Sequence, residues 1–286
     1  MCGICGEFAF AGGVRREDVD AMATAIKHRG PDDSDRYING AIGLGHRRLA
    51  IIDLSEHGRQ PMWDPGRTMC LTFNGELYNY KEIAKELQGL GVRFKSASDT
   101  EVVVTAVRQW GIEGAVKRFI GMFAFAVWDE PAQRLTLVRD RAGIKPLFYW
   151  RDEGRLLFGS ELRALLAHRG FRADIDPVGL GQFFVTGYTL GETTPLKGVR
   201  RVPAGAFVTI DRDGQARTTR YWSLDDTRRS RSIARPGEVD EALLPLLESA
   251  IGYRLVSDVP VVNFLSGGVD SSLVASVLSK RLNADV

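Results

Sequence analysis

Three predicted β-hairpins constrain the fold of this chain more than any other feature of its sequence. Each consists of two strand-like runs joined by a short turn that contains charged residues, Gly or Pro. The paired runs are residues 122–128 with 134–139, 145–151 with 155–160, and 206–210 with 216–221. Hairpins of this kind form antiparallel sheets. The middle of the chain is therefore predicted to be built on antiparallel strands.

Amphipathic helices are predicted beside these strands. Apolar residues recur at helical spacing in residues 19–26 and 80–90. Ser98 and Glu101 match a capping box, which would begin a third helix with its inner face along residues 102–110. Antiparallel strands with helices on both sides predict a layered α+β domain.

Two further strands are predicted before the hairpins. One spans residues 42–52 and is interrupted by Gly43 and Gly45. The other spans residues 71–73 and stops at Asn74-Gly75, because this dipeptide is a strong turn signal.

A change of composition near residue 223 predicts a second domain. Residues 225–237 are polar and charged, as in a linker. An amphipathic segment at 239–251, an apolar run at 259–265 and a helical segment at 270–282 follow. Strand, loop and helix in this order predict the start of an α/β domain that the chain is too short to complete. We therefore expect a first domain, a linker and an incomplete second domain at residues 2–222, 223–237 and 238–286.

The composition fits a protein without nucleic-acid or membrane partners. The chain has 38 basic and 36 acidic residues, and this net charge of +2 is too small to attract either partner. Its three cysteines form no even framework, which indicates a reducing compartment. The start of the chain lacks a basic leader and no segment approaches transmembrane length, so a cytoplasmic protein is expected.

Cys2 is the first candidate for a catalytic residue. Once Met1 is removed, Cys2 carries a thiol and a free α-amine. The amine titrates at roughly 7.7–8.0 and the thiol at about 8.5, so the amine can serve as the base without a histidine. The alternative is that Cys2 is an incidental residue at the start of a strand. A redox pair or zinc site with Cys5 is disfavoured, because both lie in an apparent strand and no second ligand pair exists.

A glycine- and serine-rich loop is the most specific motif. It reads Leu265-Ser266-Gly267-Gly268-Val269-Asp270-Ser271-Ser272 and joins the predicted apolar strand to a helix. Glycines let an anion approach the backbone, and the helix N-terminus offers free N–H groups. The alternative is a capped helix after a glycine turn. The loop has no lysine of the Walker type, but it resembles the pyrophosphate-binding loop of the N-type ATP pyrophosphatases. The residues implied to bind ATP are Leu265, Ser266, Gly267, Gly268, Asp270, Ser271 and Ser272.

Together with Cys2, this loop identifies a family resemblance that covers nearly the whole chain. The chain resembles the glutamine-hydrolysing asparagine synthetases. The matching motifs are Cys2-Gly3-Ile4, His28-Arg29-Gly30-Pro31-Asp32, Arg48-Leu49-Ala50-Ile51-Ile52-Asp53, Asn74-Gly75-Glu76-Leu77-Tyr78-Asn79, Ser98-Asp99-Thr100-Glu101, Gly121-Met122-Phe123-Ala124-Phe125-Ala126, Arg139-Asp140-Arg141-Ala142-Gly143-Ile144-Lys145-Pro146-Leu147 and Ser160-Glu161.

This resemblance implies a class II glutamine amidotransferase domain with the N-terminal-nucleophile hydrolase fold, a four-layer αββα sandwich. Cys2 would attack the side-chain amide of glutamine, and Asn74 and Gly75 would form the oxyanion hole. Arg48 would bind the α-carboxylate of the substrate and Asp99 its ammonium group. The other residues implied to line the glutamine site are Leu49, Ala50, Ile51, Ile52 and Glu76.

The resemblance also implies substrates and cofactors. L-Glutamine would supply ammonia to L-aspartate activated as its AMP ester, with ATP as the nucleotide and Mg²⁺ screening its phosphates. We expect no metal ion bound by protein side chains, and a homodimer is a possible assembly. Three alternatives stay open: a different carboxylate acceptor such as a peptide or a sugar acid, a glutaminase acting alone, and a catalytically silent binding module.

Overall fold

The computed structural model describes residues 1–227 and 236–280. The chain divides into two units: Met1–Ala50 with Ser55–Ser223, and Ile51–Leu54 with the residues from Leu224 onward. Part of the predicted linker, residues 228–235, lies outside the described residues, as does the end of the last predicted helix at 281–282.

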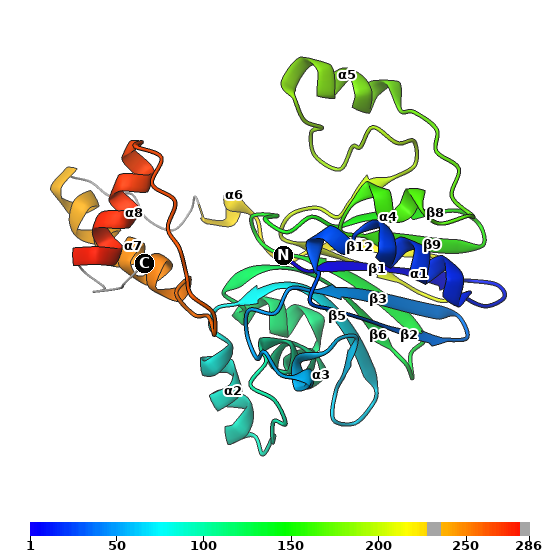
Figure 1. The fold of residues 1–286 in the computed structure, drawn as a ribbon, viewed down its shortest axis with the longest axis horizontal. Coiled ribbons are helices and arrows are strands. Elements are labelled where there is room, and N and C mark those ends of the chain that lie inside the picture. Colours follow the sequence, from blue (N-terminus) through cyan, green and yellow to red (C-terminus); the bar gives the residue numbers. More distant parts are fainter. Residues whose placement is uncertain (228–235, 281–286) are drawn as a thin grey trace. The chain divides into compact units, whose positions relative to one another are not determined.

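Two six-stranded antiparallel sheets form the first unit (Figure 1). The strands of the first sheet, in spatial order, are β10 (Arg200–Arg201), β8 (Phe148–Arg151), β9 (Arg155–Gly159), β1 (Gly3–Ala9), β3 (Ile42–Arg48) and β2 (Asp33–Asn39). Those of the second sheet are β12 (Ala216–Arg220), β11 (Ala206–Ile210), β7 (Arg134–Arg139), β6 (Gly121–Asp129), β5 (Met69–Leu77) and β4 (Met62–Trp63). The three predicted hairpins are confirmed as β6–β7, β8–β9 and β11–β12.

An apolar core fills the space between the two sheets. Ile4 and Phe8 of β1 face Cys70 of β5 and Trp128 of β6 there, and none of these four residues is more than 1% exposed. Alternate residues of β1 point the other way, so Cys5 joins a separate cluster with Met22. Each strand of the sandwich therefore contributes side chains to the space between the sheets and to a helical layer or solvent.

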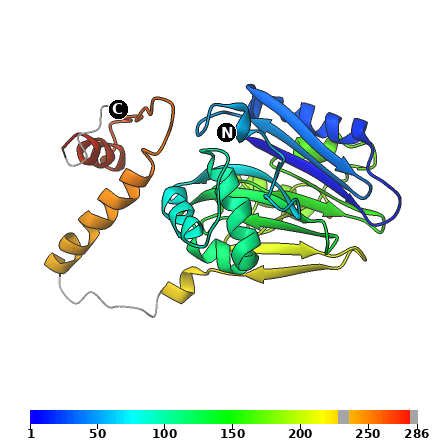
Figure 2. The same ribbon diagram turned by 90° about the horizontal axis from the view of Figure 1, so that it is seen from below.

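Helices cover the outer faces of both sheets. On the first sheet lie α1 (Arg16–Ala25) and α4 (Leu162–Leu166), while α3 (Asp99–Arg118) packs on β5 and β4 with α2 (Tyr80–Gly89) beside it. The ribbon shows the sheets stacked face to face (Figure 2). The predicted α+β fold with αββα layers is confirmed. The shorter or peripheral helices of this unit are η1 (Lys27–Arg29), η2 (Glu56–Gly58) and α5 (Pro177–Thr186).

The turn predicted at Asn74-Gly75 is wrong. Strand β5 continues through both residues to Leu77, with Asn74 opposite Ala124 and Gly75 opposite Phe123 in β6. Nine consecutive residue pairs hold the two strands together, so the long partner strand outweighs the local turn preference.

Two other local predictions need correction. Strand β3 ends at Arg48 rather than at residue 52, and it is not interrupted by its glycines. A Cβ atom on Gly45 would lie 2.9 Å from Cys5 Sγ, so the missing side chain gives room for the cluster beneath α1. The capping box is also incomplete: Ser98 accepts from Thr100 N, but Glu101 accepts from Lys95 N and Ser96 N instead of Ser98 N.

The second unit is helical in its described part. It contains α6 (Leu224–Thr227), α7 (Pro236–Tyr253) and α8 (Val269–Lys280), with Ile251, Val277 and Leu278 buried together. The strand predicted at 259–265 is wrong for these residues, since they form no ladder and Phe264 is 90% exposed. A strand needs a neighbour to satisfy its backbone, and no described segment of this unit pairs with it as a strand. No helix within residues 1–227 and 236–280 is long and apolar enough to cross a membrane.

Candidate active site

The first strand carries the start of the chain into contact with the loop after β3. Cys2 Sγ lies 3.5 Å from the carbonyl oxygen of Leu49 and accepts from Leu49 N at 3.4 Å. The guanidinium of Arg29 donates to the Cys2 carbonyl at 2.9 Å and to Glu161 at 2.9 Å. His28 also contacts Glu161, at 3.0 Å. The backbone and the thiol of Cys2 are thus both fixed.

Charged groups from several elements act on the Cys2 thiol. Burial raises the pKa of Cys2, while the hydrogen bond with Leu49, the terminal amine and Arg48 oppose that rise, and Asp99 adds to it. Burial also lowers the pKa of the Met1 amine, as do the cations of Lys145 and Arg29. A thiol that resists ionisation needs a nearby base, and an amine with a lowered pKa is neutral at a lower pH.

Strand β5 directs two predicted site residues toward the first sheet. Thr72 donates to the Gly45 carbonyl of β3 at 3.4 Å, which places that face of β5 toward the first sheet. Because side chains alternate along a strand, Asn74 and Glu76 project from the same face. Glu76 interacts electrostatically with the terminal amine. The second sheet therefore contributes polar side chains on its inner face, which points toward the first sheet.

The Asn74 side chain is fully buried, and neither atom of its amide has a hydrogen-bond partner among the described residues. Leaving a buried polar atom unpaired costs about 1–3 kcal/mol. Groups in this state require an explanation beyond stability, and a ligand that pairs with the amide is one such explanation.

Gly75 cannot carry a side chain in this strand. A Cβ atom there would lie 2.4 Å from the carbonyl oxygen of Met122 and 2.7 Å from Phe123 Cα. The glycine is thus explained by the close approach of β6 rather than by a turn.

The two arginines at the end of β3 point to different partners. Arg47 donates to the Ala23 carbonyl at the end of α1 at 2.9 Å, on the helical side of the sheet. Arg48 is 7% exposed and donates to the Ser55 carbonyl at 2.8 Å. Arg48 is among the groups that lower the pKa of the Cys2 thiol.

Asp99 is a buried carboxyl group at the N-terminus of α3. Its Oδ2 accepts from Leu77 N at 2.9 Å, which ties the helix to the end of β5. Burial, with a smaller contribution from Glu76, raises the pKa of Asp99 to about 7, although the hydrogen bonds from Leu77 and Thr100 oppose this rise. A cation bound beside it would favour the ionised carboxylate, so this group can act as a receptor for an ammonium group.

The predicted glutamine-binding segment crosses the boundary between the two units. Arg48, Leu49 and Ala50 belong to the first unit, whereas Ile51 and Ile52 belong to the second. Within the second unit, Asp258 donates its N–H to the Ile51 carbonyl at 3.0 Å and accepts from Asp53 N at 2.8 Å. The roles of Ile51 and Ile52 in the glutamine site stay predictions.

Residues 1–222 match a family described as glutamine amidotransferase domain, and residues 242–286 match one described as asparagine synthase. The chain belongs to the glutamine amidotransferase family. The resemblance to glutamine-hydrolysing asparagine synthetases is also confirmed by several relatives over most of the chain.

Relatives of this amidotransferase chain are longer than it is. Asparagine synthetase (glutamine-hydrolyzing) 3 of Bacillus subtilis is 38% identical over 97% of this chain and 45% of that protein. Putative asparagine synthetase (glutamine-hydrolyzing) 2 of Methanocaldococcus jannaschii is 35% identical over 97% of this chain and 57% of that protein. The chain therefore spans about half the length of these relatives.

A solved structure shares the fold of the amidotransferase domain. Glutamine phosphoribosylpyrophosphate amidotransferase from B. subtilis superposes with a TM-score of 0.57 at 19% identity, covering 78% of this chain and 50% of that chain. At this identity the likeness establishes the fold alone.

Lys145 of the amidotransferase domain has no role that its sequence position predicts. The residue is 3% exposed, and its charge interacts with Glu76, Arg29 and Cys2. It lies in the matching motif 139–147, but no spacing rule connects that motif with Cys2, so only the fold could reveal the proximity.

The serine- and glycine-rich loop has local order in the second unit. Ser266 Oγ and Ser271 Oγ are 3.0 Å apart, and Gly268 N donates to Ser266 Oγ at 3.4 Å. Gly267 has a φ of +81°, which glycine tolerates best, and a Cβ there would meet nothing within 4 Å. Helix α8 begins at Val269 with Asp270 in its first turn. The open glycines, the hydroxyls and the helix N-terminus fit a phosphate ligand.

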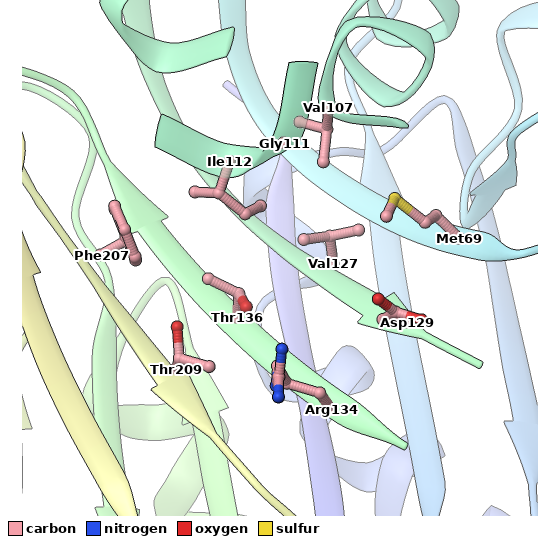
Figure 3. A pocket seen from close by; sticks show the side chains of 10 residues that line it. All are labelled: Met69, Val107, Gly111, Ile112, Val127, Asp129, Arg134, Thr136, Phe207 and Thr209. Carbon is pink, nitrogen blue, oxygen red and sulfur yellow. The ribbon is translucent and has the colours of Figure 1, made fainter. Parts of the chain in front are cut away.

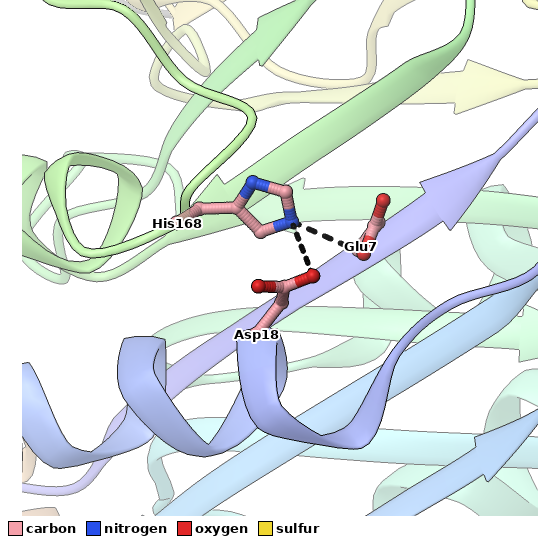
Figure 4. Close-up of side chains that lie close together, drawn as sticks. All are labelled: Glu7, Asp18 and His168. Atoms are coloured by element: carbon pink, nitrogen blue, oxygen red, sulfur yellow. Dashed lines mark hydrogen bonds and ion pairs between the residues drawn. The ribbon is translucent and has the colours of Figure 1, made fainter.

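A second polar cluster lies on the helical side of the first sheet (Figure 4). His168 Nε2 is 3.2 Å from Glu7 and 4.0 Å from Asp18, and these three groups could sterically hold a cation. However, Gly170 N donates to His168 Nδ1 at 3.0 Å, so the proton of the neutral ring is on Nε2, the atom that faces the carboxylates. Arg155 and Arg169 already pair with those carboxylates. The arrangement is that of a buried ion-pair network.

A cavity of about 300 Å³ lies between α3 and the outer face of the second sheet (Figure 3). Apolar side chains such as Val107 and Phe207 form much of its wall, and α3 departs from helical geometry at Gly111 beside it. None of the predicted site residues lines this cavity.

Proposed function

We propose that the first domain, at residues 2–222, hydrolyses glutamine at Cys2. The observation that carries this proposal is the environment of the thiol, which lies beside the chain terminus and within electrostatic reach of Arg48 and Asp99. A cation and a carboxyl group of this kind suit the α-carboxylate and the α-ammonium of a free amino acid. A nucleophile within reach of both groups suits an acyl-transfer reaction.

The reaction begins with proton transfer from the Cys2 thiol to its own α-amine, after removal of Met1. The thiolate attacks the side-chain carbonyl carbon of glutamine and forms a tetrahedral oxyanion. The protonated amine then gives its proton to the departing nitrogen, which leaves as ammonia, and a γ-glutamyl thioester remains on Cys2. Water, deprotonated by the same amine, hydrolyses the thioester to glutamate and restores the thiol.

The oxyanion is stabilised by the Asn74 amide and by the Gly75 N–H in this proposal. Its support is the unpaired, fully buried amide of Asn74, because a donor without a partner is free to bind charge as it develops. Arg48, Leu49, Ala50, Ile51, Ile52, Glu76 and Asp99 complete the proposed glutamine site.

The second domain would use the ammonia. We assign the start of an ATP site to residues 265–272, with Asp270 as an acidic group that could help hold Mg²⁺. Glycines and hydroxyls would bind pyrophosphate oxygens, and L-aspartate activated as its AMP ester would accept ammonia and give asparagine. The match of residues 242–286 to the asparagine synthase family supports this assignment.

A second candidate differs in the acceptor. A relative named Amidase chry2, from Gibberella zeae, is 34% identical over 92% of this chain. Since that relative is not named asparagine synthetase, similarity alone does not single out aspartate, and a different carboxylate acceptor such as a peptide or sugar acid is the second candidate.

Release of glutamate and ammonia from glutamine tests the proposal. After mass spectrometry has verified removal of Met1, the wild-type chain is expected to release both products in equal amounts without ATP. Cys2→Ala should reduce the rate by at least about a thousandfold, since the nucleophile is lost. Cys5→Ala is the matched control, because Cys5 is buried in the cluster beneath α1 and should leave the rate nearly unchanged. Glutamate release by Cys2→Ala at the wild-type rate would contradict the proposal.

A further inference from the structure

Strand β5 extends beyond the end of β4 at the residues of the proposed oxyanion hole. The last residue of β5 that pairs with β4 is Leu71. On the other side, Phe123 of β6 lies opposite Gly75, but Phe123 N donates to Asp140 Oδ2 at 3.2 Å and Phe123 O accepts from Asp140 N at 2.8 Å. Gly75 and Phe123 therefore form a pair without ladder hydrogen bonds, so the Gly75 N–H points away from β6. We call residues 73–77, on the side away from β6, the β5 edge.

Side chains bind the backbone at both ends of the β5 edge. Alternate residues of an antiparallel strand direct their N–H and C=O groups to the same side, so Phe73, Gly75 and Leu77 share this edge. Phe73 N donates to Gln60 Oε1 at 2.6 Å. Leu77 N donates to Asp99 Oδ2 at 2.9 Å. The Gly75 N–H lies between these two occupied positions.

A buried chain of hydrogen bonds joins the two ends. Gln60 Nε2 donates to Thr100 Oγ1 at 3.0 Å, and Thr100 Oγ1 donates to Asp99 Oδ1 at 3.5 Å. None of these three residues is more than 5% exposed, so a bond that is lost leaves a polar group without water to replace its partner. The amide of Gln60 thus uses its oxygen and its nitrogen to fix the β5 edge to the start of α3.

His46 of β3 holds the other backbone group of Phe73. Its Nε2 lies 3.2 Å from Phe73 O, and since a carbonyl oxygen only accepts, Nε2 is the donor. Burial lowers the pKa of His46 to about 4, so the ring is neutral at physiological pH. The N–H and the C=O of Phe73 are therefore both held by side chains, directly before Asn74 and Gly75.

We propose that Gln60 is a positioning residue of the glutaminase site, which holds the β5 edge so that the Asn74 amide and the Gly75 N–H face one oxyanion. This inference rests on the proposed function, since Gln60 acts only through those two donors. An oxyanion hole stabilises charge as it develops only if its donors are fixed in advance, so a displaced strand slows the reaction.

Gln60→Met should slow the reaction more than it weakens binding. The variant loses both hydrogen bonds of the amide, whereas Asp99 keeps its bonds with Leu77 and Thr100. We expect kcat for glutamine to fall about ten- to a hundredfold and KM to change less than about threefold. If Gln60→Met does not fold, Gln60→Asn replaces it, because the shorter amide cannot reach both partners.

Val199→Ala is the matched control for lost stability. Val199 is 3% exposed in the separate cluster that contains Cys5. Thermal unfolding measures how far each variant is destabilised, and Val199→Ala should keep kcat within about twofold of the wild type. Equal falls in kcat for the two variants, or a Gln60→Met variant with the wild-type kcat, would overturn the inference.

A double-mutant cycle separates positioning from a general effect. Asn74→Ala removes one of the two donors through which Gln60 is proposed to act. In this background, the effect of Gln60→Met on kcat should be at least about fivefold smaller than in the wild type. An effect of the same size in both backgrounds would contradict a role of Gln60 through Asn74.

Amide hydrogen exchange provides a second measurement that does not depend on activity. The Phe73 N–H should exchange at least about tenfold faster in Gln60→Met than in the wild type, whereas the Leu77 N–H, which Asp99 holds, should keep its rate. An unchanged rate at Phe73, or equal acceleration at both amides, would refute the positioning role. If the wild type releases no glutamate, the proposed function fails, and the exchange rates distinguish that failure from a failure of Gln60 to hold the β5 edge.

Discussion

Asp99 shows how a single residue can be favourable for binding and unfavourable for stability. Its carboxyl group is buried at the start of α3, and its pKa is raised to about 7. Ser98 and Glu101 beside it were predictable as helix-start residues from spacing alone. The proximity of Asp99 to Cys2 was not predictable in that way, because the two residues are 97 positions apart and only the fold brings them together.

Asp99→Asn should change the pH dependence of stability. Because its pKa is higher in the folded state than the usual 3.8, the folded protein holds this proton more tightly than the unfolded chain. The resulting stabilisation is complete below about pH 4 and is lost as the pH rises to about 7. Between these pH values, the melting temperature of Asp99→Asn should therefore rise relative to that of the wild type. The melting temperature of the exposed control Asp35→Asn should change with pH as that of the wild type does.

The same substitution should weaken glutamine binding. Asn keeps the shape but cannot pair with an ammonium charge, so KM for glutamine should increase about ten- to a hundredfold. An unchanged KM would remove Asp99 from the glutamine site, and parallel melting curves for Asp99→Asn and wild type would contradict the raised pKa.

At the scale of elements, the sequence predicted secondary structure correctly where residues close in the chain determine it. It failed where pairing with a distant strand determines it. The three hairpins were predictable because each turn joins strands that pair directly. The Asn74-Gly75 dipeptide was misassigned because its preference for a turn is local, whereas its pairing with Ala124 and Phe123 in β6 is not. The run at 259–265 has strand composition, but composition supplies no partner strand.

Gly75→Ala should destabilise the pairing of β5 with β6. The added Cβ would lie 2.4 Å from the Met122 carbonyl, so the strands must separate, at a cost of about 1–3 kcal/mol. Gly89→Ala in α2 is the matched control, because its Cβ meets nothing within 4 Å and alanine favours a helix. Urea unfolding at neutral pH measures both. A Gly75→Ala variant as stable as the wild type would contradict the close approach of β6.

At the scale of the whole molecule, the two units carry different parts of the proposed chemistry. The αββα unit contains most residues of the proposed glutaminase reaction, namely Cys2, Arg48, Asn74, Glu76 and Asp99. Ile51 and Ile52, which are also predicted to line the glutamine site, belong to the other unit. The second unit contains the proposed phosphate loop. Since the relatives are about twice as long as this chain, the complete synthetase reaction is proposed only for a protein of their length.

We propose that Cys2 is the nucleophile of a site that binds glutamine. The most direct test of this proposal is intact-mass spectrometry after incubation with a diazoketone analogue of glutamine, which alkylates a thiolate that attacks it. We predict one adduct per chain, mapped to Cys2, suppressed by excess glutamine and missing in Cys2→Ala. An adduct on Cys5 or Cys70, or labelling of Cys2 that glutamine does not suppress, would contradict the account.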